Sequence, residues 1–390
     1  MSFRLKTLRS DMIYFLVYIL LFFVISQSGI FKYFVLMAGI FFCFLYRKKI
    51  HIKYLSVLSH SIFYVVIGLF IAVATSNFSF ESIKQSLIFL SSGLFSVALF
   101  SLYGEQNSDR LVDIQFYALC VVYLLLYGRY FTLETFYYES NLYAYIFGIY
   151  GIIYLLKKQY FRMVFALLFM LFDHKRIADG AFFIVFVCTL LVIALKNKKY
   201  QRGIYILARV MLFFIPVLWV LFCGNGMLVT IFAKLRINTM GRLEGVGAWN
   251  IAREYYEISP LYMGRGSGWV LEWLNYAEIP AFSNLHNDFL TAYIELGFWG
   301  YLFWLASFQC MIGRYKKLKG VKYANIFCVM FGFMFINLLT DNIYLYVTFL
   351  MPFYTILLSA IYGSENWFSV AQPFAANENC GRIQKKYIGS

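Results

Sequence analysis

The sequence predicts an all-α polytopic membrane protein, and three observations lead to this fold class. Of its 390 residues, 62% are hydrophobic and only 14% are charged, so a water-soluble fold would lack the polar side chains to cover its surface. Many stretches reach the roughly 17 to 25 apolar residues that a helix needs to cross about 30 Å of hydrocarbon. The sequence also lacks the roughly ten-residue alternation that is typical of membrane β-barrels.

Hydrophobicity along the chain predicts twelve membrane spans. The first follows the basic segment "MSFRLKTLR" and has no small-residue cleavage site after it, so we interpret it as a retained helix. The predicted spans cover residues 12–28, 30–46, 54–75, 83–103, 110–127, 141–157, 161–173, 180–196, 203–223, 287–311, 321–340 and 343–362.

The basic residues predict the orientation of these spans. Basic turns at 47–53, 157–162, 196–202 and 314–320 all fall on one side of the membrane in this count. Together with both termini, Arg110 and Lys322, that side holds 23 of the 34 basic residues, which makes it the cytoplasmic side. Orientation therefore explains the net charge of +15, and no nucleic-acid partner is expected.

The longest connection lies on the opposite side and divides the chain. The predicted organisation is spans 1 to 9 (1–223), a large outer loop (224–285), spans 10 to 12 (286–362) and a cytoplasmic tail (363–390). A long loop of this kind is where binding and catalytic residues concentrate. Its residues 237–260 can form an amphipathic helix in the headgroup layer, with Trp249, Ala252 and Tyr256 near one face. Gly245 and Gly247 count against that helix.

The seven cysteines indicate neither a disulfide framework nor a metal site, because no two of them form a CxxC pair. No DxD-type metal motif is visible in the outer loops either. We therefore expect a reaction without metal or other cofactor. No internal repeat of the kind found in inverted-repeat transporters is visible.

Two cations stand in a tight outer turn, where the charge rule disfavours them. "FDHKRIADG" places Lys175 and Arg176 before the eighth predicted span. Both side chains could simply contact phosphates of the outer leaflet, and this is at least as good an explanation as catalysis. His174 is better interpreted as an interfacial side chain. Arg209, inside the ninth span, is close enough to the cytoplasmic end to snorkel.

The large loop contributes further candidates for binding an anion. Arg242, Arg253 and Arg265 follow Lys234 and Arg236 along the chain. "SPLYMGRGSGW" sets Arg265 among Gly264, Gly266 and Gly268, and such glycines permit a backbone whose N–H groups converge on a phosphate. Loops of this kind are also common as plain turns.

The start of the tenth span carries His286, Asn287 and Asp288 together. Asn287 or Asp288 can cap the helix that begins there, which is the ordinary role of such residues. His286 is the only histidine of the loop region and projects away from the face shared by Asp288 and Glu295. Glu295 lies about two turns into the hydrocarbon, so we expect it to face the bundle interior or a wet cavity.

These segments resemble one known family. "LHNDFLTAYIELGFWGYLFW" is similar to the signature of the O-antigen ligase and polymerase family of bacterial envelope glycan enzymes. "MGRLEGVGAWNIAREYYEISPLYMGRGSGW" resembles the outer loop of that family, and "DHKRIADGAFFIVFV" resembles its motif with an arginine at the outer start of a middle span. The motifs cover roughly residues 165 to 315, and "HKR" stands where Ser-Arg is more usual.

The resemblance implies a GT-C-like glycosyltransferase that takes a glycan from undecaprenyl pyrophosphate and transfers it to a sugar hydroxyl. It assigns catalysis to Arg176, Arg242 and His286. The chemistry suits these residues, because a departing pyrophosphate needs positive charge and the acceptor hydroxyl needs a base. The substrate-binding candidates are Arg265, Lys175, Arg253, Gly266, Asp288 and Glu295.

The resemblance leaves the acceptor open. A polymerase adds the growing chain to the next lipid-linked repeat unit, whereas a ligase transfers it to lipid A core. The 33 tyrosines and 44 phenylalanines favour the polymerase by association only. A lipid-linked oligosaccharide flippase and a non-catalytic assembly protein are the alternatives. The expected location is the bacterial inner membrane with a periplasmic active site. The expected partners are membrane lipid and the glycan donor and acceptor, and a chain-length regulator protein is a further candidate partner.

Overall fold

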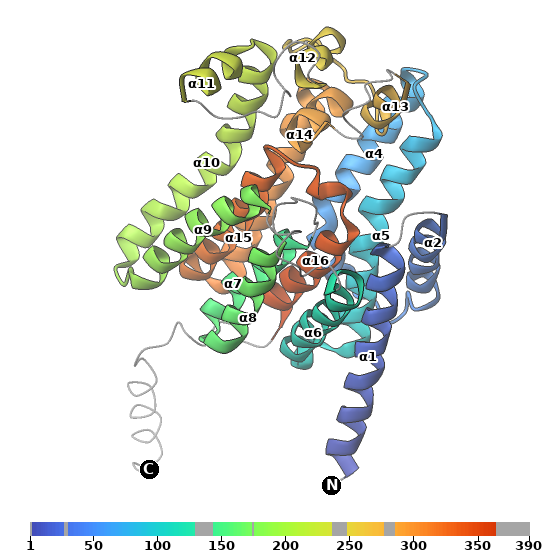
Figure 1. Cartoon of the computed structure of the whole chain (residues 1–390), viewed down its shortest axis with the longest axis vertical. Coiled ribbons are helices and arrows are strands. Elements are labelled where there is room, and N and C mark those ends of the chain that lie inside the picture. Colours follow the sequence, from blue (N-terminus) through green and yellow to red (C-terminus); the bar gives the residue numbers. More distant parts are fainter. Residues whose placement is uncertain are drawn as a thin grey trace, which may run out of the picture.

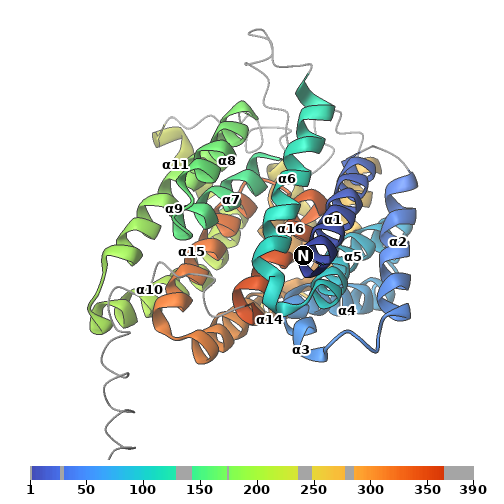
Figure 2. The same ribbon diagram turned by 90° about the horizontal axis from the view of Figure 1, so that it is seen from below.

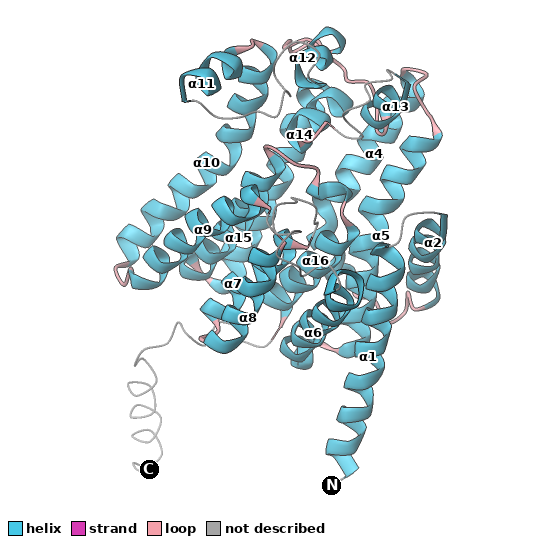
Figure 3. Ribbon diagram, viewed as in Figure 1, coloured by secondary structure: helices cyan, strands magenta, loops and turns pink. Residues whose placement is uncertain are grey.

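The computed structural model of the protein is built from helices. It describes residues 2–26, 30–128, 143–173, 175–235, 248–276 and 285–363, and no strand occurs in these ranges (Figures 1 and 3). Seven helices of the described chain are long and apolar enough to cross a membrane. The protein is therefore a helical membrane protein with several spans, as the sequence predicts.

The first half of the chain forms helices α1 to α8 and two 3-10 turns. Their bounds are α1 Ser2–Ser26, α2 Ile30–Leu45, α3 Ile52–Leu55, η1 Ser56–Leu58, α4 Ser59–Ala74, α5 Phe80–Tyr103, η2 Glu105–Asn107, α6 Ser108–Tyr127, α7 Ala144–Leu156 and α8 Tyr160–Phe172.

The second half forms the remaining spans and the helices of the large loop. Their bounds are α9 Arg176–Ala194, α10 Lys198–Gly224, α11 Met227–Leu235, α12 Ala248–Ala252, η5 Arg253–Tyr255, α13 Trp269–Tyr276, α14 Asp288–Lys319, α15 Val321–Leu338, η6 Ile343–Leu345 and α16 Val347–Tyr362. Helices α11, α12 and α13 lie at the top of Figure 1, and we call this the loop side.

Each of the twelve predicted hydrophobic segments coincides with a helix. Four of these helices, α2, α7, α8 and α16, have 13 to 16 residues and are shorter than the seven candidate spans, so twelve complete crossings stay a prediction. Helix α7 is apolar all round, which is the pattern of a helix buried on every side, and every one of its residues is buried. Viewed from below, α7 and α16 lie inside the bundle, between α1 and α2 on one side and α9 and α10 on the other (Figure 2).

Helix α14 reverses direction at Gly297, which the sequence did not predict. Gly297 has a left-handed φ of 70°. The ring centroids of Phe289 and Trp304 are 6.0 Å apart, although 15 residues of straight helix would separate them by about 22 Å along the axis. The expected span 287–311 is thus a helical hairpin. Its short arm, 288–296, runs back along the first turns of the long arm, 298–319.

The helices of the bundle differ in length. Helices α5 and α10 have 24 and 27 residues, whereas α7 and α16 have 13 and 16. In Figure 1 the red segment that leads into α16 lies well below the upper ends of α4, α5 and α10. The residues between α15 and α16 therefore lie deeper in the bundle than the large loop on the same side.

The amphipathic helix expected over residues 237–260 is wrong in extent and in environment for its described part. Residues 236–247 lie outside the described residues, and residues 248–255 form only the single turn of α12 and the 3-10 turn η5. Trp249 is only 3% exposed, and its indole nitrogen donates to the carbonyl oxygen of Leu285 at 2.5 Å. The Trp249 side chain therefore packs against protein rather than against lipid headgroups.

Arg209 is held by groups of the protein, and its snorkelling to the cytoplasmic end stays a prediction. Its guanidinium donates to the side-chain oxygen of Gln309 at 2.9 Å and to the backbone oxygen of Gln309 at 3.3 Å. The Gln309 amide donates in return to the backbone oxygen of Arg209 at 3.2 Å. Because polar groups in hydrocarbon need partners, this exchange fastens α10 to the long arm of α14.

Candidate functional site

His286 lies directly before the short arm of α14. The backbone around it is fixed on both sides, since Trp249 holds the Leu285 carbonyl and Asn287 caps the helix by accepting from the Leu290 amide at 3.0 Å. The capping role expected for Asn287 is thus confirmed. His286 itself has a φ of 52°, a left-handed conformation that few non-glycine residues adopt and that often marks a functional position.

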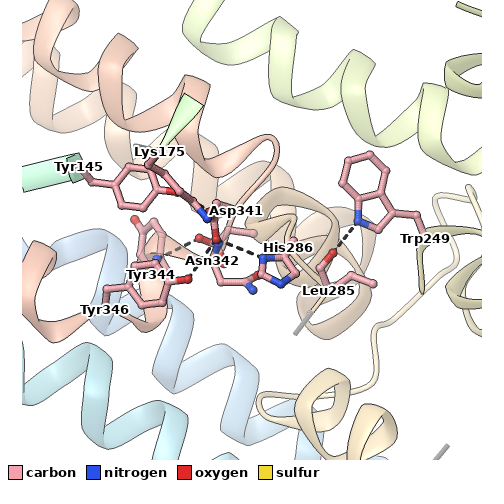
Figure 4. A network of polar contacts seen from close by, with 10 residues as sticks. Tyr145, Lys175, Trp249, Leu285, His286, Asp341, Asn342, Tyr344 and Tyr346 are labelled. Atoms are coloured by element: carbon pink, nitrogen blue, oxygen red, sulfur yellow. Dashed lines mark hydrogen bonds and ion pairs between the residues drawn. The ribbon is translucent and has the colours of Figure 1, made fainter. Parts of the chain in front are cut away.

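Asp341 is the centre of a polar cluster between α15 and α16 (Figure 4). It follows α15, and its side chain is 2% exposed. One carboxylate oxygen lies 3.3 Å from Nδ1 of His286, and the other lies 2.9 Å from Nζ of Lys175. The hydroxyls of Tyr145 and Tyr346 also donate to the Asp341 carboxylate. The backbone amide of Asn342 donates to it at 2.8 Å.

The cluster keeps Asp341 ionised. Burial alone would raise the pKa of this carboxyl, but the hydrogen bond from His286, the charge of Lys175 and the hydroxyl of Tyr145 together hold the pKa well below its usual range. A fixed negative charge therefore stands beside the imidazole at every physiological pH.

This geometry selects one form of the histidine ring. A neutral imidazole that donates from Nδ1 to a carboxylate carries its lone pair on Nε2. The His286 side chain is 24% exposed, so part of the ring is accessible while Nδ1 is held by Asp341. A carboxylate that orients an imidazole in this way is the usual support of a histidine that acts as a general base.

Of the other two expected catalytic residues, the structure describes Arg176 but not Arg242. Arg176 opens α9 as its first residue and is exposed, directly after Lys175. Arg242 lies outside the described residues, and so does His174. The structure thus brings Lys175 and His286 together on Asp341, with Arg176 one residue along the chain.

Asp288 and Glu295 are both buried, but each is held by protein groups. One Asp288 oxygen accepts from the Tyr344 amide at 2.9 Å. Glu295 is 0% exposed, as expected for a residue that faces the interior, and accepts from the Tyr64 hydroxyl at 2.6 Å and from the Gly268 amide at 3.1 Å. Since the latter amide opens α13, Glu295 stabilises the positive end of that helix.

The glycine turn does not form the expected anion cradle. The amides of Arg265 and Gly266 donate to backbone oxygens of the short arm of α14 at 2.9 Å each, and the Ser267 amide donates to the oxygen of Gly68 at 2.9 Å. A Cβ at Gly266 would collide with the backbone of Ala72. These glycines allow close packing between the turn, α4 and α14, and the amides of residues 265–268 already have acceptors within the protein.

Arg265 and Arg253 also contact the loop itself. Arg265 donates from Nε to the oxygen of Tyr255 at 3.1 Å, and its guanidinium lies 5.5 Å from the ring centre of Trp269. Arg253 is exposed and donates to the oxygen of Gly224 at 3.0 Å, at the end of α10. Both arginines therefore have a structural role, and their expected role in substrate binding stays a prediction.

Asp341 and the two tyrosines that donate hydrogen bonds to it were not among the site residues that the sequence predicted. One signal was present, because "TDN" at 340–342 interrupts two predicted spans with polar residues. Nothing local connects it to His286, 55 residues earlier, or to Lys175, 166 residues earlier. Tyr145 was hidden within an apolar segment.

An apolar groove of about 340 Å³ lies between α9, α10 and α15. Helices α9 and α10 are joined by the short turn 195–197, which is fixed to the bundle because Asn325 donates to the oxygen of Gln201 at 2.9 Å. The residues that line the groove include Ile184, Met211, Pro216, Phe289, Ile336 and Leu339. Phe289 and Leu339 lie one and two residues from Asp288 and Asp341, so this end of the groove approaches the polar cluster.

Comparison with known proteins adds no relative to this description. No protein-family model, no curated protein and no solved structure matches the chain.

Proposed function

We propose that this protein is a metal-independent, inverting glycosyltransferase of the bacterial inner membrane, with twelve spans, a GT-C-like fold and a periplasmic site. In this proposal it polymerises an envelope polysaccharide by moving a glycan from undecaprenyl pyrophosphate to a hydroxyl of a lipid-linked repeat unit. The observation that carries the proposal is the contact between His286 and Asp341, beside Lys175.

The geometry suits the proposed reaction at the base. The acceptor hydroxyl oxygen attacks the anomeric carbon and forms the new glycosidic bond, while the bond from that carbon to the phosphate oxygen breaks. The hydroxyl proton passes to Nε2 of His286, and Asp341 stabilises the imidazolium that results. A positioned base typically contributes roughly 10² to 10⁴-fold to the rate.

The cations suit the leaving group. The electron pair of the broken bond departs with the pyrophosphate, whose charge must be balanced where it develops. Lys175 is close to the base because both contact Asp341, and Arg176 follows it at the start of α9. Arg242 completes the proposed set by the family resemblance alone.

The apolar groove supports a lipid-linked substrate. It is lined almost entirely by apolar side chains, and one end approaches the cluster that would hold the phosphates. A polyprenyl chain lying between α9 and α10 would thus place its head group near Lys175 and His286.

Deletion of the gene followed by glycan analysis tests the proposal. Loss of a polymerase leaves single repeat units on the lipid A core, loss of a ligase leaves lipid-linked polymer and bare core, and loss of a flippase leaves repeat units facing the cytoplasm. We expect the first result. Complementation with His286→Gln should fail to restore polymer at equal protein level, whereas His51→Gln, at an exposed histidine remote in sequence from the site, should restore it. Normal polymer with His286→Gln would refute the proposed base.

A further inference from the structure

Two of the most exposed apolar side chains of the described chain lie in one turn of the large loop. Leu261 is 86% exposed and Met263 is 72% exposed. Large apolar side chains at such exposure usually mark a surface that another phase or molecule covers. The turn that carries them, 259–264, ends at Gly264, the first of the glycines of the segment that packs against α14.

The turn is held rigidly rather than being a loose loop. The Tyr262 amide donates to the Ser259 oxygen at 3.0 Å, and the Leu261 amide donates to the Ser259 hydroxyl at 3.2 Å. The Tyr262 oxygen accepts from the Phe298 amide at 2.9 Å, and its hydroxyl donates to the Ile294 oxygen at 2.9 Å. The amides of Leu261 and Tyr262 and the backbone oxygens of Ser259 and Tyr262 thus have partners within the protein, which lowers the free-energy cost of moving these groups out of water.

The same bonds place the turn at the reversal of the α14 hairpin. Immediately after Phe298, α14 exposes Trp299 and Phe303, at 55% and 59%. These two residues begin the long arm of a candidate membrane span, so lipid is the medium that covers them. Leu261 and Met263 flank the residue that bonds to Phe298, and they therefore extend this lipid-facing surface at its outer edge.

Charged side chains mark the other side of the boundary. Glu254 and Glu257 precede the turn in the same loop and are exposed. Within about ten residues the chain changes from exposed carboxylates to exposed apolar side chains. This is the pattern of a segment that enters the headgroup layer at its tip and stays in water at its base.

We propose that the turn 259–264 inserts Leu261 and Met263 into the outer leaflet of the bilayer as a fixed anchor. The anchor is bonded to the apex of the α14 hairpin, so it would set the depth of the short arm that carries His286 at its start. The proposal concerns a contact with lipid and does not depend on the proposed glycosyl transfer.

Site-directed fluorescence in liposomes tests this contact. Cys188 and Cys310 are the exposed cysteines of the described chain and are replaced by alanine. Single cysteines at Leu261, Met263, Glu254 or Glu257 are then labelled with an environment-sensitive dye, and the chain without an introduced cysteine gives the background. Trp299→Cys serves as the lipid-facing control. The probes are a lipid with a nitroxide near its head group and aqueous iodide.

Dyes at positions 261 and 263 should emit at shorter wavelength and be quenched by the nitroxide lipid as strongly as the dye at 299, with several-fold less quenching by iodide than at 254 and 257. Iodide quenching at 261 equal to that at 254 would overturn the proposal, because the turn would then lie in water. Protection from both quenchers would overturn it too, since a protein surface would then cover the turn. None of these readouts changes if the polymerase assignment fails.

Discussion

Asp341 supplies the negative charge that orders the loop-side cluster at the scale of single residues. It joins His286, Lys175, Tyr145 and Tyr346, which come from four separate segments of the chain. Removing this buried carboxylate costs more than one contact, because the four side chains that contact it lose their common acceptor. The carboxylate is therefore the most sensitive point of the candidate site.

Asp341→Asn should lower the rate of polymer formation by on the order of 10²-fold, with the protein still inserted in the membrane. The amide keeps the shape but loses the charge that orients the His286 ring and balances its protonated form. Tyr346→Phe is the matched control, because it removes one hydrogen bond at 3.0 Å and leaves the carboxylate intact. Initial rates with lipid-linked repeat units distinguish the two variants, and equal rates would contradict the proposed role of Asp341.

At the scale of elements, the hairpin of α14 positions both the histidine and the lipid-facing turn. Its reversal depends on Gly297, whose left-handed backbone lies against Met263 and Gly264. The long arm then continues through Gly313, where a side chain would meet no atom within 4 Å. These two glycines make opposite demands, which allows a matched test of the hairpin.

Gly297→Ala should destabilise the protein by about 1 to 3 kcal/mol, because it adds left-handed strain and a collision with backbone atoms. Gly313→Ala should be neutral or raise stability by about 0.4 to 1 kcal/mol, since it only limits the unfolded chain. Thermal unfolding in detergent compares the two variants. If both behave alike, Gly297 does not form the reversal.

The groove between α9, α10 and α15 offers a test of how the substrate is bound. Gly332 lines it, and a Cβ added there would meet no atom within 4 Å, so the larger side chain of Gly332→Phe has room to enter the groove. We expect a KM for the lipid-linked donor that rises at least several-fold, with stability unchanged. Gly313→Phe, on the long arm of α14 and outside the groove, is the control. A normal KM for Gly332→Phe would exclude the groove as the lipid site.

At the scale of the whole molecule, the Asp341 cluster lies on the loop side of the bundle. Helices α11 to α13 cover that side, and the N-terminus lies at the opposite end (Figure 1). The basic turns predict that the opposite end faces the cytoplasm. A site that takes its substrate from the outer leaflet requires this orientation.

Cysteine labelling in intact cells tests the orientation. A cysteine at Glu254, in the large loop, should react with a membrane-impermeant maleimide. A cysteine at Lys48, in a basic turn, should react only after the membrane is broken. Both positions are exposed in the folded chain, so burial does not confuse the comparison. The reverse pattern would place the candidate site in the cytoplasm and exclude the proposed function.

The sequence by itself determined the positions of the helices, the Asn287 cap and the inward position of Glu295. These properties are local, since hydrophobicity decides which segments leave water and a capping side chain acts within one helical turn. Only the tertiary structure decided that α14 reverses at Gly297 and that Asp341 joins His286 to Lys175. Both depend on contacts between segments that lie 33 to 166 residues apart, as Gly264 lies from Gly297 and Lys175 from Asp341, and no periodicity in a single sequence records such pairings.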